Sequence, residues 1–217
     1  MFNELVNNPF TTVNVIGYGT KWSGFFGKLR AMKKVFRKLH PETLVVLVDG
    51  FDTKIAMDVK IAEERYRNIF PHSPILFSRD CGIDIPIIGK WLHRRMFGSN
   101  AVANAGMYMG PAGKIVQLMR EAEKIEKTCM GDDQRAFNML SEWFDVDMDG
   151  LIFRNLSFKE RKHDNEQTAV FIGYPGEVSF PRAIRAVTEY SKFLWIDIVG
   201  IVIAFLTVKT LMYRKAR

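Results

Sequence analysis

The chain has 217 residues, of which 47% are hydrophobic and 12% aromatic, so it holds enough apolar material for one sizeable core and is neither disordered nor fibrous. Four basic residues at the extreme C-terminus, Lys209, Arg214, Lys215 and Arg217, supply much of the formal net charge of +7, so the rest of the chain is only mildly basic. That distribution argues against nucleic-acid binding, which needs a basic stripe with interleaved aromatic residues on the folded domain.

The first predicted elements alternate between strand and helix. Thr12 to Ile16 has the composition of a short strand and leads into the turn Gly17-Tyr18-Gly19. Apolar residues then recur at helical spacing from Leu29 to Leu39, with basic residues between them, and Pro41 ends that helix. The unbroken apolar run Leu44 to Val48 is typical of a strand that is covered on both faces.

The alternation continues through the middle of the chain and predicts an α/β domain over residues 1–185, with a Rossmann-type, mostly parallel sheet and flanking helices. The further predicted elements are a helix at Val59 to Asn68, a strand at Ile75 to Ser78, a helix that Pro111 opens after the segment Met107 to Gly110 and that continues to about Lys127, a helix that follows Asp132 and Asp133 and reaches Trp143, and a hairpin that joins Val146-Asp147 to Leu151–Arg154 through Asp149-Gly150.

Residues 193–213 form a predicted transmembrane helix after this domain. The centre of the segment, Ile198 to Val208, is uncharged and mainly aliphatic, and about twenty residues cross a bilayer core. Trp195 and Tyr213 lie near the two ends, as aromatic belts do, and a basic cluster beginning at Arg214 follows. A buried terminal core helix is the alternative. Because the N-terminus lacks a secretory signal, we expect a single-pass membrane protein whose folded domain is cytosolic.

Two carboxylates follow the predicted strand Leu44 to Val48. Asp49 and Asp52 lie three residues apart in a turn that contains Gly50. Strand ends of parallel sheets open onto the crevice where ligands bind, and carboxylate oxygens are ligands that Mg²⁺ and Mn²⁺ prefer. The spacing therefore indicates a candidate metal site that could grip a diphosphate. The alternative is that both residues only cap the turn.

A second acidic pattern is Asp145-x-Asp147-x-Asp149-Gly150, which matches the opening of an EF-hand calcium loop. The closing position of such a loop would be Leu156 rather than a bidentate glutamate. Calcium binding is therefore not the favoured interpretation of this segment.

Five segments, in one order, resemble the glycosyltransferase domain of procollagen lysyl hydroxylases and collagen glycosyltransferases, a domain of the GT-A type. The residues that carry the resemblance are Gly17-Tyr18-Gly19 and Trp22-Ser23-Gly24 with the lysine-rich helix Lys28 to Lys38 and the strand Leu44 to Asp52, then Ile75-Leu76-Phe77-Ser78, Asn104 to Gly110, Gly131-Asp132-Asp133-Gln134, and Ile152-Phe153-Arg154-Asn155-Leu156.

The resemblance implies a GT-A-like fold that uses a nucleotide-sugar donor, with a UDP-sugar expected, and Mn²⁺ or Mg²⁺. It implies that Asp49 and Asp52 hold the metal and that Phe51 lies near the base. Trp22 and Lys28 are candidates for contacts with the nucleotide and its phosphates. A core tryptophan and a solvated lysine are the alternatives for these two residues.

The same resemblance implies that Asn104 and Gly106 lie beside the donor sugar and that Asp132 and Asp133 face the reacting centre. A carboxylate there could accept the proton of the acceptor hydroxyl or stabilise positive charge at the anomeric carbon. Paired aspartates before a helix are also ordinary N-cap residues, so capping is the alternative for Asp132 and Asp133.

The sequence departs from the family in three places that bear on activity. Cys81 to Pro86 replaces the family's Cys-Trp-Pro segment, so the acceptor cannot be carried over from the family. The family's first strand, which helps to build the nucleotide pocket, has no counterpart before Val15, and the histidine that usually completes the metal site is absent from Phe171 to Gly176. We therefore expect a metal-assisted hexosyltransferase that transfers a sugar to a hydroxyl of a protein or glycan near a membrane. The alternative is a catalytically degenerate domain that serves as a membrane-tethered binding or scaffold module. A metal-dependent phosphohydrolase ranks last, because no nucleophile is visible.

Overall fold

The computed structural model describes residues 1–82, 89–97, 102–157, 160–162 and 168–175, together with residues 191, 195, 199–200 and 202–207. The chain divides into two units, Met1–Glu177 and Val178–Arg217. All strands described below belong to the first unit. Within the described residues, no helix is both long and apolar enough to cross a bilayer. Most of the predicted span at 193–213 lies outside the described residues, so that span stays a prediction.

The first unit contains helices and strands of both sheets in alternation, so the expected α/β class is confirmed. The helices are α1 (Phe2–Val6), α2 (Phe25–Phe36), α3 (Val59–Ile69), α4 (Gly89–Phe97), α5 (Ala112–Lys124) and α6 (Asp133–Met139), with a 3₁₀ turn η1 at Ser141–Trp143. The strands are β1 (Leu44–Val48), β2 (Thr53–Ile55), β3 (Leu76–Arg79), β4 (Ala103–Pro111), β5 (Asp145–Asp147), β6 (Phe153–Asn155) and β7 (Phe171–Gly173).

The larger sheet has the strand order β1-β4-β3-β5. Strands β1, β3 and β5 point in one direction, and β4 runs antiparallel to both of its neighbours. The expectation of a mostly parallel sheet is therefore correct for the direction of three strands and wrong for the pairing, since β4 separates β1 from β3. A long inserted strand of opposite direction leaves no mark on the apolar pattern that predicted the fold.

Strand β4 contains a bulge that turns part of it toward the end of β1. Phe77 pairs with Tyr108, but the next residue of β3, Ser78, pairs with Asn104, so Ala105 to Met107 are extra residues on β4. A bulge bends the strand and changes which face a side chain takes. Asn104 and Gly106 consequently lie next to the carboxyl end of β1, whose following residue continues the backbone pairing.

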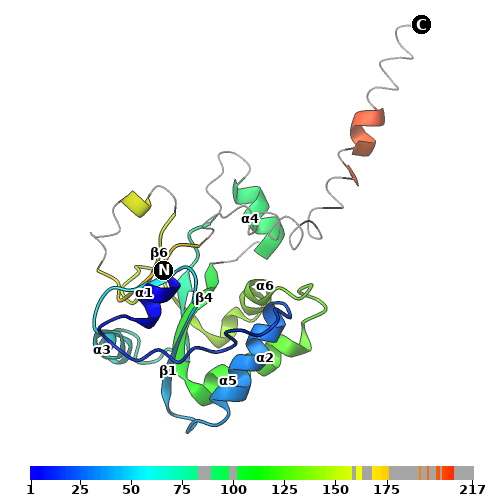
Figure 1. Ribbon diagram of the computed structural model, residues 1–217. Helices are drawn as coiled ribbons and strands as arrows, with labels where there is room; N and C mark the ends of the chain where they lie inside the picture. Colours follow the sequence, from blue (N-terminus) through cyan, green and yellow to red (C-terminus); the bar gives the residue numbers. More distant parts are fainter. Residues whose placement is uncertain are drawn as a thin grey trace, which may run out of the picture. The chain divides into compact units, whose positions relative to one another are not determined.

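One face of the larger sheet is covered by α2, α5 and α6. Leu29 of α2, Leu118 of α5 and Phe137 of α6 are buried with Phe77 and Tyr108 of the sheet in one core cluster. The rings of Phe77 and Tyr108 stack with their centroids 4.6 Å apart. Figure 1 shows α2 and α5 side by side on this face. The spacing of the apolar residues correctly predicted both helices.

The opposite face is covered by α3 and by the smaller sheet, whose strand order is β2-β7-β6. Met107 and Met109 of β4 pack there against Phe153 of β6 and Phe171 of β7. Figure 1 places α1 and α3 on this side of β1 and β4. The two core clusters therefore sandwich the larger sheet and hold the end of β1 between them.

Two local predictions are wrong. Val146-Asp147 and Leu151–Arg154 do not form a hairpin, because β5 pairs with β3 whereas β6 pairs with β7 in the other sheet. The turn at Gly150 is present, with a φ of 70° that favours glycine. Thr12 to Ile16 has no regular secondary structure and is not a strand. A strand requires a hydrogen-bonded partner, and the alternation of side chains does not reveal whether one exists.

Candidate functional site

Three charged side chains meet where α2 and α6 begin and β1 ends. The ammonium Nζ of Lys28 is 2.9 Å from Oδ2 of Asp133 and 3.3 Å from Oδ1 of Asp49. The side chain of Asp133 is 5% exposed, that of Lys28 20% and that of Asp49 39%. The structure thus brings together one residue predicted to bind nucleotide, one predicted to bind metal and one predicted to be catalytic.

Each member of this Lys28–Asp49–Asp133 cluster occupies the end of an element. Lys28 lies in the first turn of α2, Asp49 directly follows β1, and Asp133 is the first residue of α6. The backbone N–H of Asp49 donates to the carbonyl of Gly106 at 2.8 Å, which ties the end of β1 to the bulge of β4. The cluster is therefore held by rigid elements.

The ionisation of Lys28 is controlled by its surroundings. Burial alone would lower the pKa of Lys28, but the charges of Asp133 and Asp49 outweigh it and hold the pKa above its ordinary value. Lys28 is therefore an ammonium at any physiological pH. Burial also raises the pKa of Tyr108, whose hydroxyl has no hydrogen-bond partner among the described residues. A neutral phenol thus lies under the charged cluster.

The glycine at position 106 is required by the close approach of two side chains. A Cβ at that position would lie 2.8 Å from Oδ1 of Asn104 and 3.1 Å from Oδ2 of Asp49. Oδ1 of Asn104 instead accepts a hydrogen bond of 2.8 Å from the backbone N–H of Gly106. Asn104 and Gly106 therefore lie beside Asp49, and their place beside a donor sugar stays a prediction.

A hydrogen-bonded chain that sequence reasoning missed leads away from Asn104. Its amide donates to Oε1 of Gln134, and Gln134 donates through Nε2 to Oδ2 of Asp80 at 2.8 Å. Nε2 of His93, on α4, lies 2.7 Å from the same carboxylate oxygen. Asp80 could have been found because it follows strand β3 as Asp49 follows β1. His93 could not, since α4 carries no chemical motif.

Asp132 and Asp133 have different surroundings although they are adjacent. Oδ1 of Asp132 accepts a hydrogen bond of 2.7 Å from the backbone N–H of Arg135, which makes Asp132 the N-cap of α6. The capping alternative is therefore what the structure shows for Asp132. Oδ2 of Asp133 lies against the ammonium of Lys28, so Asp133 belongs to the charged cluster. A catalytic role for either residue stays a prediction.

The turn that carries Asp52 is fastened to the segment after β7. The carbonyl of Asp52 accepts a hydrogen bond of 2.7 Å from the backbone N–H of Tyr174. Tyr174 belongs to the segment that was compared with the family's histidine stretch, so this segment contacts the turn that carries Asp52, a predicted metal ligand. The pairing of Thr53 with Gly173 continues the same contact.

Exposed aromatic rings flank this turn. The ring of Phe2, from α1, stacks on the ring of Tyr18 and on the ring of Phe51, with centroids 5.3 Å apart in both pairs. Tyr18 is 72% exposed and Phe51 66% exposed. Phe51 was predicted to lie near a base, whereas Phe2 and Tyr18 were missed because their proximity depends on the path of α1. Trp22 is also partly exposed and packs edge-on against Phe25.

The residues present can bind a divalent cation only together with ligands from a bound nucleotide and from water. Asp49 and Asp52 offer the hard oxygen donors that Mg²⁺ or Mn²⁺ prefers, and the missing Cβ of Gly106 leaves space beside Asp49. The described residues contain no group of three or more histidine, cysteine, aspartate or glutamate side chains placed to hold a metal. Any ion at Asp49 and Asp52 would therefore need phosphate and water oxygens as its other ligands.

The acidic pattern that begins at Asp145 stabilises a turn of the backbone. Asp147 is fully buried, and its two carboxylate oxygens accept hydrogen bonds from the backbone N–H groups of Leu151, Ile152 and Phe153. These contacts hold the chain as it passes from β5 in one sheet to β6 in the other. The preference for a non-calcium interpretation agrees with this geometry.

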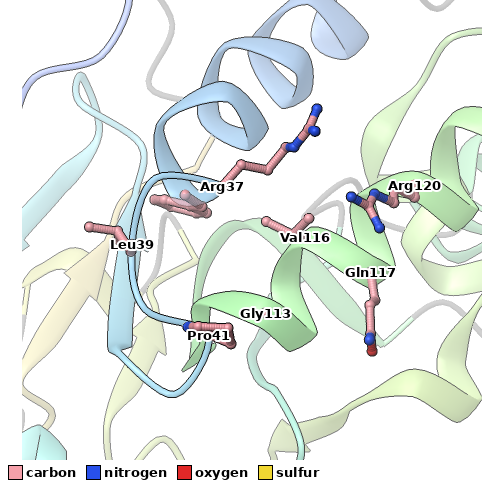
Figure 2. A pocket seen from close by; sticks show the side chains of 8 residues that line it. Arg37, Leu39, Pro41, Gly113, Val116, Gln117 and Arg120 are labelled. Carbon is pink, nitrogen blue, oxygen red and sulfur yellow. The ribbon is translucent and has the colours of Figure 1, made fainter.

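A hollow lies away from the charged cluster, between α2 and α5. It has a volume of about 290 Å³ and is lined by residues that include Phe36, Arg37, Pro41, Val116 and Arg120. Figure 2 shows the side chains of Arg37, Pro41, Val116 and Arg120 near the loop that precedes β1. Since Asp49 follows β1, the hollow and the charged cluster lie at opposite ends of that strand.

The sequence matches no protein-family model and no curated protein. Among solved structures, the apo form of mouse xyloside xylosyltransferase 1 is similar to this chain with a TM-score of 0.45 and 14% identity, over 76% of this chain and 70% of that one. The apo form of the glycosyltransferase GlyE from Streptococcus pneumoniae TIGR4 is similar with a TM-score of 0.43 and 13% identity, over 87% of this chain and 48% of that one. Both similarities are too low to carry an argument about this chain.

Proposed function

We propose that this protein is a glycosyltransferase that moves a sugar from a nucleoside diphosphate, with UDP as the expected nucleotide, to a hydroxyl group of a protein or glycan. The observation that carries the proposal is the convergence of separate sequence segments at one place. Lys28, Asp49 and Asp133 contact one another, and the bulge at Asn104 to Gly106 borders them. These segments are those that resemble the lysyl hydroxylase glycosyltransferase domain, and packing alone does not require them to meet.

The charge of the site fits a diphosphate that arrives with a cation. Lys28 pairs with Asp49 and Asp133, and Asp52 adds a third carboxylate in the adjoining turn, so we expect the site to repel a bare diphosphate. Asp49 and Asp52 would hold Mn²⁺ or Mg²⁺, which neutralises the leaving nucleoside diphosphate when it is bound. The carboxylates of this turn thereby favour a donor whose phosphate oxygens can also bind the metal.

Lys28 is the residue best placed to contact the diphosphate. Its ammonium is held at the opening of the cluster by Asp49 and Asp133, and it has three N–H donors to share between carboxylate and phosphate oxygens. A contact with phosphate strengthens as negative charge grows on the leaving oxygen. Lys28 thus assists the departure of the diphosphate without transferring a proton.

Asp133 is assigned to the reacting centre. During transfer the bond from the anomeric carbon to the phosphate oxygen breaks, a bond from that carbon to the acceptor oxygen forms, and the acceptor hydroxyl loses its proton. A carboxylate beside this carbon stabilises its positive charge or accepts that proton. Because Oδ2 of Asp133 is buried against Lys28, it becomes available only when Lys28 turns toward phosphate.

The exposed rings beside Asp52 provide a surface for the base. The rings of Tyr18 and Phe51 both stack on the ring of Phe2, so their positions are fixed. Large parts of both rings remain exposed to solvent. A flat pyrimidine can stack on such a face. We infer that this surface substitutes for part of the nucleotide pocket that the family's first strand would otherwise form.

A second candidate function is a binding or scaffold module with a degenerate site. The contact between Lys28 and Asp49 favours it, because that ammonium already neutralises one proposed metal ligand, and so does the lack of a third metal ligand among the described residues. The two functions differ in one measurable property, which is whether Mn²⁺ and nucleotide bind cooperatively.

Calorimetry on the full chain in detergent micelles separates these functions. We expect Mn²⁺ and UDP to bind with positive coupling of ~1–3 kcal/mol, because each supplies ligands to the other. Asp49→Asn should abolish the coupling, whereas Asp133→Asn should retain it and remove transfer of sugar from UDP-sugars. Asp149→Asn, an exposed aspartate in a distant turn, is the matched control. If the affinity for UDP is unchanged by Mn²⁺ and by Asp49→Asn, the metal assignment is contradicted. If UDP does not bind at all, the scaffold function is favoured.

The location of this activity is part of the proposal. We propose that residues 193–213 tether the domain to a membrane from the cytosolic side, so that the acceptor lies near that surface. Extraction of membranes at alkaline pH should leave the full chain in the pellet. Release of the chain into the supernatant would show that the segment does not span the bilayer.

A further inference from the structure

We propose that a surface formed by the end of α2 and the middle of α5 docks on the surface of an anionic lipid bilayer. We call this surface the basic face. Its residues are Lys34 in α2, Arg37 and Lys38 directly after α2, and Arg120 in α5. All four side chains are exposed. They line two adjoining hollows, which share Arg37. The proposal does not depend on sugar transfer.

The basic face carries positive charge that the protein itself does not neutralise. Residues 25–40 contain six basic residues and no acidic ones. Lys33 forms an ion pair with Glu123 of α5, and Arg30 forms one with Glu126, which follows α5. In contrast, the ion pairs found among the described residues do not involve Lys34, Arg37, Lys38 or Arg120. These two glutamates thus compensate one part of α2 and leave the part near the loop positively charged.

Aliphatic side chains are interleaved with these charges. Val35 and Leu39 are each 39% exposed, although most large apolar residues of α2 are buried. Figure 2 shows Leu39 and Pro41 beside Arg37, with Val116 between Arg37 and Arg120. Basic groups at the level of lipid headgroups, with aliphatic groups that reach the acyl boundary, are the composition of interfacial membrane-binding surfaces.

The same features argue against other anionic partners. Binding of single-stranded nucleic acid uses exposed aromatic rings on which bases stack, and the one ring that lines these hollows, Phe36, is 7% exposed. An acidic helix would need a deep apolar groove for its anchoring side chains, but the hollow holds only about 290 Å³. A bilayer needs neither a groove nor stacking rings. A bilayer is therefore the partner that this surface fits best.

The position of the basic face leaves the charged cluster free. Lys28 and Arg37 are nine positions apart along α2, which corresponds to about 14 Å. The hollow precedes β1, whereas Asp49 follows it. Docking of the basic face would therefore hold the domain on the membrane with the Lys28–Asp49–Asp133 cluster open to water.

Vesicle binding by the full chain tests the proposal. We compare flotation with phosphatidylcholine vesicles and with vesicles that also contain phosphatidylserine, for the natural chain and for the variant Lys34→Glu, Arg37→Glu, Arg120→Glu. The expected result is that the variant loses the preference for phosphatidylserine by roughly tenfold or more, because each lost cation weakens attraction to the anionic surface. The preference of the natural chain should also fall as salt is raised.

A matched control separates the basic face from net charge and from the C-terminus. The variant Lys60→Glu, Lys90→Glu, Lys162→Glu makes the same charge change at exposed lysines elsewhere in the first unit. Every chain in this comparison keeps Arg214, Lys215 and Arg217, so their attraction to lipid cancels. The control should retain the preference, and circular dichroism should show equal helix content in all three chains.

Three outcomes would overturn the proposal. Equal loss in the variant and the control would show that only net charge matters. An unchanged preference in the variant would show that the C-terminal cluster alone recognises lipid. Binding of polyglutamate that depends on Lys34, Arg37 and Arg120, without any such dependence for vesicles, would identify an acidic protein as the partner instead. If Glu substitutions disturb folding, Lys34→Gln, Arg37→Gln, Arg120→Gln provides the same comparison with a smaller charge change.

Discussion

The two ends of α2 carry basic side chains in opposite situations. Near its start, Lys28 is 20% exposed and lies between Asp49 and Asp133, whereas near its end Lys34 and Arg37 are exposed and have no ion pair among the described residues. The difference arises because α2 begins beside the ends of β1 and α6 and finishes beside a loop. One helix therefore presents charge as part of a preorganised site at one end and as a general electrostatic surface at the other.

The largest expected difference between the two ends is in stability. Lys28→Met leaves the buried carboxylate of Asp133 without its partner, so we expect the free energy of unfolding to fall by about 3 kcal/mol. Lys34→Met removes an exposed charge and should change it by no more than about 0.5 kcal/mol. Urea unfolding of both variants measures the contrast. Similar losses in the two variants would mean that Lys28 is solvated like Lys34.

In the alkaline range, the raised pKa of Lys28 makes its stabilisation of the fold depend on pH. Because the folded protein raises the pKa of Lys28, its contribution is fully present below the unfolded value of about 10.4 and declines as pH rises toward the higher folded value. The gap in unfolding free energy between the natural chain and Lys28→Met should thus stay constant on the alkaline side up to about pH 9 and shrink above pH 10.4. A gap that closes between pH 7 and 9 would contradict the ion-pair explanation.

Gly106→Ala tests how tightly the site end of α2 is packed. The added Cβ would approach Oδ1 of Asn104 to 2.8 Å and Oδ2 of Asp49 to 3.1 Å, so one of them must move. We expect UDP to bind about tenfold more weakly, which is about 1.4 kcal/mol. The natural chain is the reference. Calorimetry that finds the same UDP affinity in Gly106→Ala as in the natural chain would show that Gly106 does not belong to the site.

The smallest expected effect distinguishes the two adjacent aspartates. Asp132→Ala removes the N-cap of α6 and should cost about 1 kcal/mol of unfolding free energy, whereas Asp132→Asn keeps a capping oxygen and should cost much less. Sugar transfer should survive Asp132→Asn if Asp132 only caps. If Asp132→Asn loses sugar transfer while its stability is unchanged, Asp132 acts at the reacting centre, as the resemblance implies.

Much of the fold could be predicted because its helices and longer strands carry strong periodic patterns. The apolar spacing predicted α2, α3 and α5 within a few residues, and β1 was predicted with the bounds that the structure shows. The strands β2 and β7 were missed, since three residues show no period. The hairpin was wrong for a related reason: the turn at Gly150 is local, but the partners of β5 and β6 lie in different sheets.

By itself, the sequence determined which residues could carry chemistry and that strand ends would present them. Asp49 follows an apolar run, and Asp132-Asp133 precede a helix, which are facts of local composition. Tertiary structure alone decided that Lys28 would join Asp49 and Asp133, that Asp132 would cap α6, and that Phe2 would support Tyr18 and Phe51. The physical reason is that an ion pair, a bulge or a ring stack depends on distances between segments far apart in the chain, which no local pattern encodes.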